Sequence, residues 1–369
     1  MDEALLKAEE RAVFALRALY RRFGYQPFKM SKFEEYELYA RNLDFLPSER
    51  VITFPSADGR LMALKPDVTL SIIKKGEDLP GVRQRLCYDE SVYRPAGDTG
   101  EFREITQTGL ECIGDLGGYE IAEVVCLAHR SLALVGERHI LALNHLGLVA
   151  ALLDETGAEG ALRQALIGCL AGKNLHDLRR LAAENALPET AVETLCACAG
   201  IYGPLAAALG RLRPRCPTGA AQAAVRELEE LCAILEGEER AESIVFDFSL
   251  VSDLRYYNGV VFRGYLPGAA ESVLAGGQYD KLMQRMGRRA RGIGFALYLD
   301  RLESLSREAR EYNVDLLLLL DEDLPPREAM ALVRRYDDGK TRLSVQRALP
   351  PKLRCRDVLD LRKRGSGTC

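Results

Sequence analysis

The sequence predicts an α+β fold in which a mostly antiparallel sheet is flanked by helices and interrupted by a helical insertion. Two pairs of strand segments, 51–54 with 61–64 and 85–94 with 104–113, are each joined by a short turn or a Gly-rich connection, as antiparallel strands usually are. Residues from about 143 to 242 are rich in Ala, Leu, Arg and Glu and lack strand alternation, which indicates a helical block. Strand and helix signals on both sides of this block favour an α+β core.

The first 135 residues carry the signals of three helices and five strands. Apolar side chains at helical spacing run from Leu5 to Phe23 and stop at Gly24, a residue type that commonly ends helices. An Asp58-Gly59 turn separates the two strands of the first hairpin. In chain order, we expect a helix over 5–23, a strand over 25–30, the hairpin over 51–64, a helix over 66–75, strands over 85–94 and 104–113, and a helix over 119–135.

After the helical block, strand and helix signals alternate again. The expected strands cover 243–250, 260–265, 272–275 and 314–320, and the expected helices cover 280–286, 295–306 and 326–336. We therefore expect a core domain over 1–310, which includes the helical insertion at about 143–242, and a truncated C-terminal α/β segment over 311–369. Residues 340–369 contain nine Lys or Arg against two Asp or Glu, so we expect a basic tail that is solvated and partly disordered.

Composition and charge exclude several classes of protein. The net charge of -4 gives no overall attraction to nucleic acid or to an anionic membrane. The N-terminus lacks the apolar core of a signal peptide, and the longest apolar run, Leu316 to Leu320, is far too short to span a membrane. None of the ten cysteines forms a Cys-x-x-Cys pair, so we expect reduced thiols in a cytoplasmic protein. Because the common phosphate-binding and zinc-binding signatures are also missing, we expect no metal and no cofactor.

Four colinear stretches carry the most specific information. They are Ala63–Thr69 (ALKPDVT), Tyr93–Glu111, Leu250–Gly259 (LVSDLRYYNG) and Gly276–Leu302, the last of which contains GGQYD, GIGF and DRL. Over about residues 1–305 they resemble the motifs of histidyl-tRNA synthetases, which are class II aminoacyl-tRNA synthetases. The resemblance implies the class II synthetase-like antiparallel sheet flanked by helices, with the helical block as an insertion.

The resemblance also implies a binding site for free histidine. In the family, acidic and hydroxyl side chains meet the amino group, while a glutamate and tyrosine hydroxyls hold the imidazole ring. These residue types suit the ligand, because a carboxylate accepts an imidazole N–H and a phenol can donate to or accept from a ring nitrogen. The matching residues are Asp67, Thr69 and Gln107 for the amino-acid end, and Glu111, Tyr257 and Tyr279 for the ring.

Other positions depart from the family's pattern where activation of histidine needs positive charge. Formation of an aminoacyl-adenylate brings a carboxylate to a triphosphate, so the site must supply fixed cations. A family arginine matches Ser252, the adenine-positioning glutamate matches Ala96, and a second arginine matches Glu101. Since the loss of one such charge typically costs about 10²–10³ in rate, we expect negligible adenylation and no catalytic residue. The remaining candidate anion-binding residues are Arg94, Arg103 and Arg301.

Two further regions differ from a working synthetase. Motif 1, which builds the family's dimer interface, has Ser31 in place of its customary proline, although a class II-like dimer is still expected. A working synthetase carries an anticodon-binding domain of about 100 residues, whereas only 57 residues follow Tyr312. We therefore do not expect tRNA as a partner, and salt-dependent RNA binding by the basic tail is the alternative.

A synthetase-like chain with a histidine pocket and a damaged ATP site resembles the family of ATP phosphoribosyltransferase regulatory subunits. The resemblance implies a non-catalytic chain that is required by the short-form catalytic subunit, in the first step of histidine biosynthesis. It also implies a hetero-oligomer and feedback inhibition, with free histidine as the effector. Two alternatives stay open: a divergent active histidyl-tRNA synthetase, and a paralogue that senses histidine or tRNA for another partner.

Overall fold

The structure is a computed structural model that describes residues 8–46, 50–76, 81–95, 101–251, 254, 256–302 and 312–362. The chain divides into two compact units, one formed by residues 12–302 and the other by residues 303–369 together with residues 1–11. None of the helices in the described ranges is both long and apolar enough to cross a membrane.

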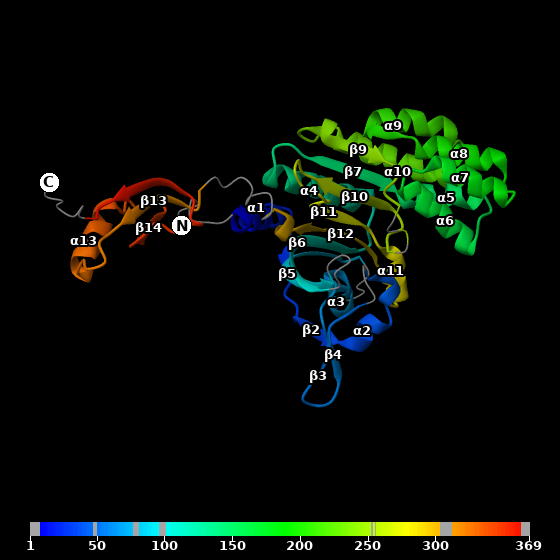
Figure 1. The fold of residues 1–369 in the computed structure, drawn as a ribbon. Coiled ribbons are helices and arrows are strands. Elements are labelled where there is room, and N and C mark those ends of the chain that lie inside the picture. The colour runs from blue at the N-terminus through cyan, green and yellow to red at the C-terminus, as the bar shows by residue number, and fades with distance from the viewer. Residues whose placement is uncertain are drawn as a thin grey trace. The chain divides into compact units, whose positions relative to one another are not determined.

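The larger unit is built around a mixed sheet of nine described strands (Figure 1). Neighbouring strands run antiparallel except β1 with β5 and β7 with β9, which are parallel. This arrangement confirms the predicted α+β fold class. The strand order is β1 (Gln26–Pro27), β5 (Arg83–Pro95), β6 (Phe102–Gly114), β12 (Arg291–Tyr298), β11 (Leu274–Gln278), β10 (Val260–Tyr265), β7 (Ile140–His145), β9 (Ile244–Asp247) and β8 (Tyr202–Pro204).

The register of four strands places two glycines beside a glutamate. Glu111 on β6 lies opposite Leu86 on β5 and, on its other side, opposite Gly294 on β12. Gly294 in turn lies opposite Gly277 on β11. The two glycines of this row leave room that other side chains fill, the Glu111 carboxyl beside Gly294 and the Tyr257 ring beside Gly277.

A smaller layer packs beside the β5–β6 hairpin. It contains the three-stranded antiparallel sheet β2 (Phe33–Glu35), β4 (Leu61–Leu64) and β3 (Thr53–Pro55), and the helices α2 (Tyr36–Ala40), η2 (Leu43–Phe45), α3 (Val68–Lys75) and α11 (Asp280–Arg285). Its core contains Tyr39, Ile72, Ile73, Tyr88 and Leu282, all buried. Because six of the eight residues of α3 are buried, this helix is fixed against the hairpin from its first turn.

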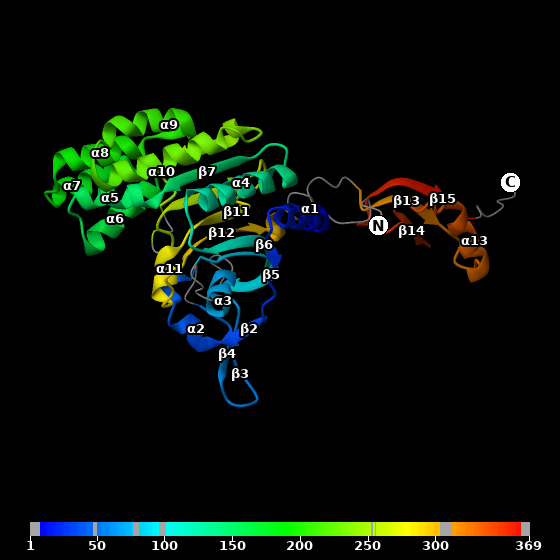
Figure 2. The same cartoon turned by 180° about the vertical axis from the view of Figure 1, so that it is seen from behind.

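Helices α1 (Ala8–Arg22) and α4 (Gly118–Val135) belong to the other side of the core. Helix α4 lies across β7, β10, β11 and β12 (Figure 2). The Tyr20 ring on α1 packs edge-on against Phe295 on β12 with centroids 6.0 Å apart, and the Tyr20 hydroxyl lies 3.1 Å from the Ser131 hydroxyl on α4. The two helices are thus joined to the sheet and to each other by buried contacts.

Helices dominate the stretch between β7 and β9. They are α5 (Leu146–Glu155), α6 (Gly160–Ala171), α7 (Leu175–Glu184), α8 (Glu189–Ala199), α9 (Leu205–Leu212), η3 (Arg213–Arg215), α10 (Gly219–Leu235) and η4 (Ala241–Ser243). The expected helical start at about residue 143 is three residues too early, because β7 runs through His145 and α5 begins at Leu146. The stretch also holds β8, which pairs with β9 and has no apolar alternation in its Tyr-Gly-Pro sequence.

The helix expected over 295–306 is wrong in its first four residues. Phe295–Tyr298 continue β12, which pairs with β11 on one side and β6 on the other. Residues on both faces of this strand are buried, so the sequence shows an apolar run without alternation. The described helical residues begin at Leu299.

The smaller unit contains a parallel three-stranded sheet of β14 (Leu343–Gln346), β13 (Val314–Leu319) and β15 (Cys355–Asp360), together with helix α13 (Pro326–Tyr336). β13 and α13 lie where the sequence predicts them. The expectation of a solvated tail from residue 340 is wrong for β14 and β15, which pair with β13 on either side. Their side chains are mostly exposed or half-buried and often charged, so their hydrophobic pattern is weak.

Candidate functional site

A cavity of about 630 Å³ is lined by residues from β5, β6, α3, β10, β11 and β12. Eight of the nine residues predicted for the site line it: Asp67, Thr69, Arg94, Gln107, Glu111, Tyr257, Tyr279 and Arg301. The ninth, Arg103, is an exposed residue that does not line the cavity. Two of the three departures from the family, Ser252 and Ala96, lie outside the described residues, and the third, Glu101, is exposed.

Glu111 is the most enclosed charged group of the cavity. Its side chain accepts a 2.7 Å hydrogen bond from Thr69 Oγ1 and a 2.6 Å hydrogen bond from the Tyr279 hydroxyl. Only 2% of the residue is exposed, and burial raises the pKa of its carboxyl to about 8, although both hydroxyl hydrogen bonds favour the ionised form. The site therefore holds a carboxyl that a ligand N–H can approach and that takes up or releases a proton near neutral pH.

Asp67 joins the cavity to the start of α3. It caps this helix, since its Oδ1 accepts a 2.9 Å hydrogen bond from the Leu70 N–H. Arg94 lies beside it, with Nη2 3.4 Å from Asp67 Oδ2 and Nε donating to the Pro66 carbonyl at 2.6 Å. Burial raises the pKa of the Asp67 carboxyl, and the Arg94 cation opposes this rise. The Arg94 guanidinium thus already interacts with two groups of the protein, the Pro66 carbonyl and the Asp67 carboxylate.

Gln107 presents a free donor in a buried position. The residue is 3% exposed, and its Nε2 has no hydrogen-bond partner within the part of the chain that the structure describes. Leaving such a group unpaired costs about 1–3 kcal/mol. An acceptor on a bound molecule, such as a carboxylate oxygen, would remove this cost.

Six tyrosines line the same cavity, of which the sequence predicts only Tyr257 and Tyr279. The Tyr256 ring lies between them, with centroids 4.6 Å from Tyr257 and 6.2 Å from Tyr279. Tyr88 on β5 donates to the Phe295 carbonyl at 3.4 Å. Burial raises the pKa of Tyr256, Tyr88 and Tyr279 well above the usual value, so all three keep their protons.

Two of the tyrosines that the sequence prediction missed, Tyr256 and Tyr88, have different signals in the sequence. Tyr256 adjoins Tyr257 in the sequence and shares its stretch. Tyr88 lies opposite Gly109, and a Cβ at Gly109 would be 2.7 Å from the Tyr88 hydroxyl. A glycine directly opposite a tyrosine on the neighbouring strand can indicate that the tyrosine needs space there. This signal can be read only when the register of the hairpin is known.

Two glycines next to the cavity's tyrosines provide room rather than backbone freedom. A Cβ at Gly292 would lie 2.2 Å from the Tyr279 ring, and one at Gly277 would lie 2.9 Å from the Tyr257 ring. Neither distance is compatible with ordinary van der Waals contact. The rings of Tyr279 and Tyr257 therefore leave room only for glycine at positions 292 and 277.

Arg301 also lines the cavity, next to Tyr298. Its guanidinium stacks over the Tyr298 ring at 4.4 Å, forms a 2.5 Å ion pair with Glu271, and donates to the Ser272 carbonyl. Within the described ranges, no three His, Cys, Asp or Glu side chains lie together as metal ligands would.

Comparison with known proteins identifies the family. The family model described as histidyl-tRNA synthetase matches residues 1–302. The ATP phosphoribosyltransferase regulatory subunit of Symbiobacterium thermophilum is 32% identical over 340 residues, which cover 88% of this chain and 83% of that protein. The chain belongs to the histidyl-tRNA synthetase-like family of ATP phosphoribosyltransferase regulatory subunits. This membership confirms the prediction from the sequence that the chain is a regulatory subunit of this family.

Solved structures agree with this fold. An ATP phosphoribosyltransferase regulatory subunit/histidyl-tRNA synthetase from Bacillus halodurans C has a TM-score of 0.72 at 24% identity, covering 100% of this chain and 97% of that chain. The ATP phosphoribosyl transferase (HisG:HisZ) complex from Thermotoga maritima contains a chain with a TM-score of 0.62 at 20% identity, covering 79% and 97%. At these identities, the likeness concerns the fold alone.

Proposed function

We propose that this regulatory subunit binds free histidine in the cavity without activating it, and that the bound histidine inhibits a short-form catalytic subunit of ATP phosphoribosyltransferase. The observation that carries the proposal is the buried Glu111 carboxyl, held by Thr69 and Tyr279 beside the unpaired Gln107 amide. Such a set of fixed polar groups rejects molecules that leave its members unpaired.

The geometry suits both ends of histidine. Glu111 can accept an imidazole N–H, and Tyr257 and Tyr279 line the same cavity. Asp67 offers a carboxylate to the amino group, and the Gln107 amide offers a donor to the carboxylate. Each predicted contact thus has a group of the right polarity in the cavity.

The arginines support the absence of adenylation. Arg94 is held by Asp67 and the Pro66 carbonyl, and Arg301 by Glu271, the Ser272 carbonyl and the Tyr298 ring. Arg103 does not line the cavity. Because each of these two arginines already faces a carboxylate, it offers a triphosphate less uncompensated positive charge than adenylation requires. We therefore propose that the chain itself is not an enzyme.

The partner is inferred from the family. The complex from Thermotoga maritima has the fold of this chain in one of its subunits, which supports assembly with a catalytic subunit in the first step of histidine biosynthesis. We also propose a class II-like dimer within that hetero-oligomer and a cytoplasmic location. Coupling between the histidine site and the partner must be reciprocal, so catalytic-subunit binding changes histidine affinity by the same factor.

Three measurements test the proposal. Calorimetry should show saturable histidine binding, and ATP–pyrophosphate exchange should stay at background with histidine present. A short-form catalytic chain should co-purify, gain activity from this chain, and lose that activity when histidine is added. Histidine-dependent exchange would favour the divergent synthetase, while salt-dependent tRNA binding without an effect on the catalytic chain would favour the sensing paralogue. A lack of both histidine binding and any effect on the catalytic chain would refute the proposal.

A further inference from the structure

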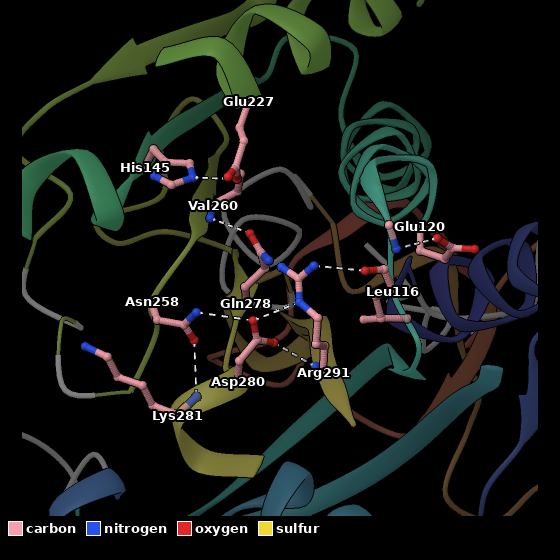
Figure 3. A network of polar contacts seen from close by, with 12 residues as sticks. Leu116, Glu120, His145, Glu227, Asn258, Val260, Gln278, Asp280, Lys281 and Arg291 are labelled. Atoms are coloured by element: carbon pink, nitrogen blue, oxygen red, sulfur yellow. Dashed lines mark hydrogen bonds and ion pairs between the residues drawn. The ribbon is translucent and has the colours of Figure 1, made fainter. Parts of the chain in front are cut away.

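Two residues, Gln278 and Asp280, hold the segment that follows Tyr256 and Tyr257 (Figure 3). The Gln278 carbonyl accepts a 2.9 Å hydrogen bond from the Asn258 N–H, and its side-chain Oε1 accepts a 2.8 Å hydrogen bond from the Val260 N–H. Gln278 is 2% exposed, so these bonds form in a buried environment where they hold the backbone firmly.

The Asp280 carboxylate is the centre of the network in Figure 3. Its Oδ2 accepts from the Asn258 side-chain amide at 3.3 Å and from Arg291 Nε at 3.1 Å, while its Oδ1 accepts from the Gly292 N–H at 3.0 Å. Arg291 also donates to the Leu116 carbonyl at 2.9 Å. One carboxylate thereby joins the segment after β9, the first residues of β12 and, through Arg291, the segment after β6.

The groups that Asp280 holds are next to the tyrosines of the cavity. Asn258 directly follows Tyr257, and its Oδ1 accepts a 3.3 Å hydrogen bond from the Lys281 N–H. The Gly292 carbonyl accepts the Tyr279 N–H at 2.9 Å. A movement of Asp280 would therefore shift Tyr257 through Asn258, and it would shift Tyr279 through Gly292.

We propose that Asp280, which does not line the cavity, is a positioning residue that fixes Tyr257 and Tyr279 relative to each other for recognition of the imidazole ring. This inference rests on the proposed function. Sites that recognise a ligand by hydrogen bonds require their groups to be held within about 0.5 Å, and a carboxylate with three donors on two separate segments provides such support.

A simpler role for Asp280 is an ion pair with Arg291 at the protein surface. The Arg291 side chain is 42% exposed, and such a pair contributes little. The positioning role differs from this ion pair in two ways. It depends on the hydrogen bonds of Asp280 with Asn258 and Gly292, and its loss changes the affinity for the ligand. The two roles therefore predict different results for variants that alter Asn258.

The test compares three variants by histidine calorimetry. Asp280→Asn places an amide against the Asn258 amide and Arg291, and should raise the histidine Kd about tenfold or more. The swapped pair Asn258→Asp with Asp280→Asn restores a donor facing an acceptor and should recover part of the affinity. Lys281→Ala is the control, because this exposed side chain lies on the same helix and the N–H that bonds Asn258 is retained.

Hydrogen exchange provides the second measurement. In Asp280→Asn, amides of residues 256–259 and 291–294 should exchange faster, while α4 and α10 should keep their protection. An unchanged histidine Kd, an equal loss in Lys281→Ala, or a loss of protection spread over all of residues 12–302 would each overturn the inference. If the wild-type chain does not bind histidine, the proposed function fails, and the exchange comparison still tests whether Asp280 fixes the two segments.

Discussion

Gly294 leaves the space that the Glu111 carboxylate occupies: a Cβ at position 294 would lie 1.8 Å from Glu111 Oε2 and 2.5 Å from the Leu110 carbonyl oxygen. The two residues are directly opposite in the register of β12 and β6. Atoms cannot approach this closely, so a side chain at 294 and Glu111 in its present position exclude each other. The family resemblance identifies both Glu111 and Gly294, but it does not show that a side chain at 294 would occupy the position of the Glu111 carboxyl.

Gly294→Ala should abolish detectable histidine binding. The new methyl group would displace the Glu111 carboxylate from Thr69 and Tyr279, and its contact with the Leu110 carbonyl should also destabilise the chain by about 1–3 kcal/mol. Calorimetry and chemical denaturation measure the two effects. Gly168→Ala is the matched control, since nothing lies within 4 Å of its Cβ position and it sits inside α6; it should retain binding and be slightly more stable. Histidine binding by Gly294→Ala with wild-type affinity would contradict this account of the pocket.

Tyr279→Phe should weaken histidine binding by about tenfold or more. The change removes one of the two hydroxyl donors to Glu111 and leaves a buried carboxyl with an unsatisfied oxygen. Tyr119→Phe provides the control, because Tyr119 also donates to a glutamate, Glu123 at 2.8 Å, but is 65% exposed. Titration of both variants with histidine under the same conditions compares their histidine affinities. An equal loss in the two variants would show that the effect does not come from the cavity.

The stability of the chain should depend on pH through Glu111. Its pKa is about 8 in the folded chain against a usual value of 4.5. Between these values the folded state holds a proton that the unfolded state has released, so this residue's contribution to stability falls as the pH rises through that range. Glu111→Gln should lack this contribution. Denaturation midpoints at about pH 5, pH 6.5 and pH 8 test the difference between the two proteins.

The comparison with Glu111→Gln is needed because other buried groups oppose this trend. Burial lowers the pKa of His129 and of His139, so their contribution to stability rises with pH. Both histidines are present in both proteins and cancel in the difference. A difference that stays constant with pH would be inconsistent with a raised pKa at Glu111.

Lys65→Met should destabilise the chain by about 3 kcal/mol. Lys65 is fully buried, and its Nζ forms a 2.8 Å ion pair with Glu90, whose side chain is 14% exposed. Removal of one partner leaves the other charge poorly solvated and uncompensated. Arg17→Met is the control, because its pair with Asp89 is 39% and 29% exposed and should contribute less than about 1 kcal/mol. Similar losses in the two variants by chemical denaturation would count against the burial argument.

The sequence was sufficient for elements whose pattern is local. The hairpin at 51–64, the strands β5 and β6, and the helices α3, α4 and α13 all have periodicity or turn signals of their own. Phe295–Tyr298 do not, because a strand between two neighbours is buried on both faces and loses its alternation. β15 is the opposite case, since its side chains are mostly exposed and its pairing with β13 leaves little mark on the sequence.

The candidate site shows a similar division. The resemblance selected eight residues that line one cavity, although they come from stretches far apart in the chain. It did not reveal Tyr88, whose place depends on the hairpin register, or the position of Arg103 outside the cavity. Nor did it show that Arg94 and Arg301 are held by other groups of the protein. The identity of a residue follows from the sequence, whereas its partners require the register and the fold.

The parallel pairing of β7 with β9 determines how the helical stretch could be exchanged or removed. Ile244 at the start of β9 lies opposite Leu141, four residues before the end of β7. At about 3.3 Å per residue, the stretch therefore leaves and re-enters the sheet at points about 13 Å apart along the strand direction. Parallel neighbours need a long crossover. These helices consequently cannot be deleted as a unit, because a short linker between β7 and β9 would separate β9 from the sheet. An insertion transplanted from another protein would need to bridge the same distance between the end of β7 and the start of β9.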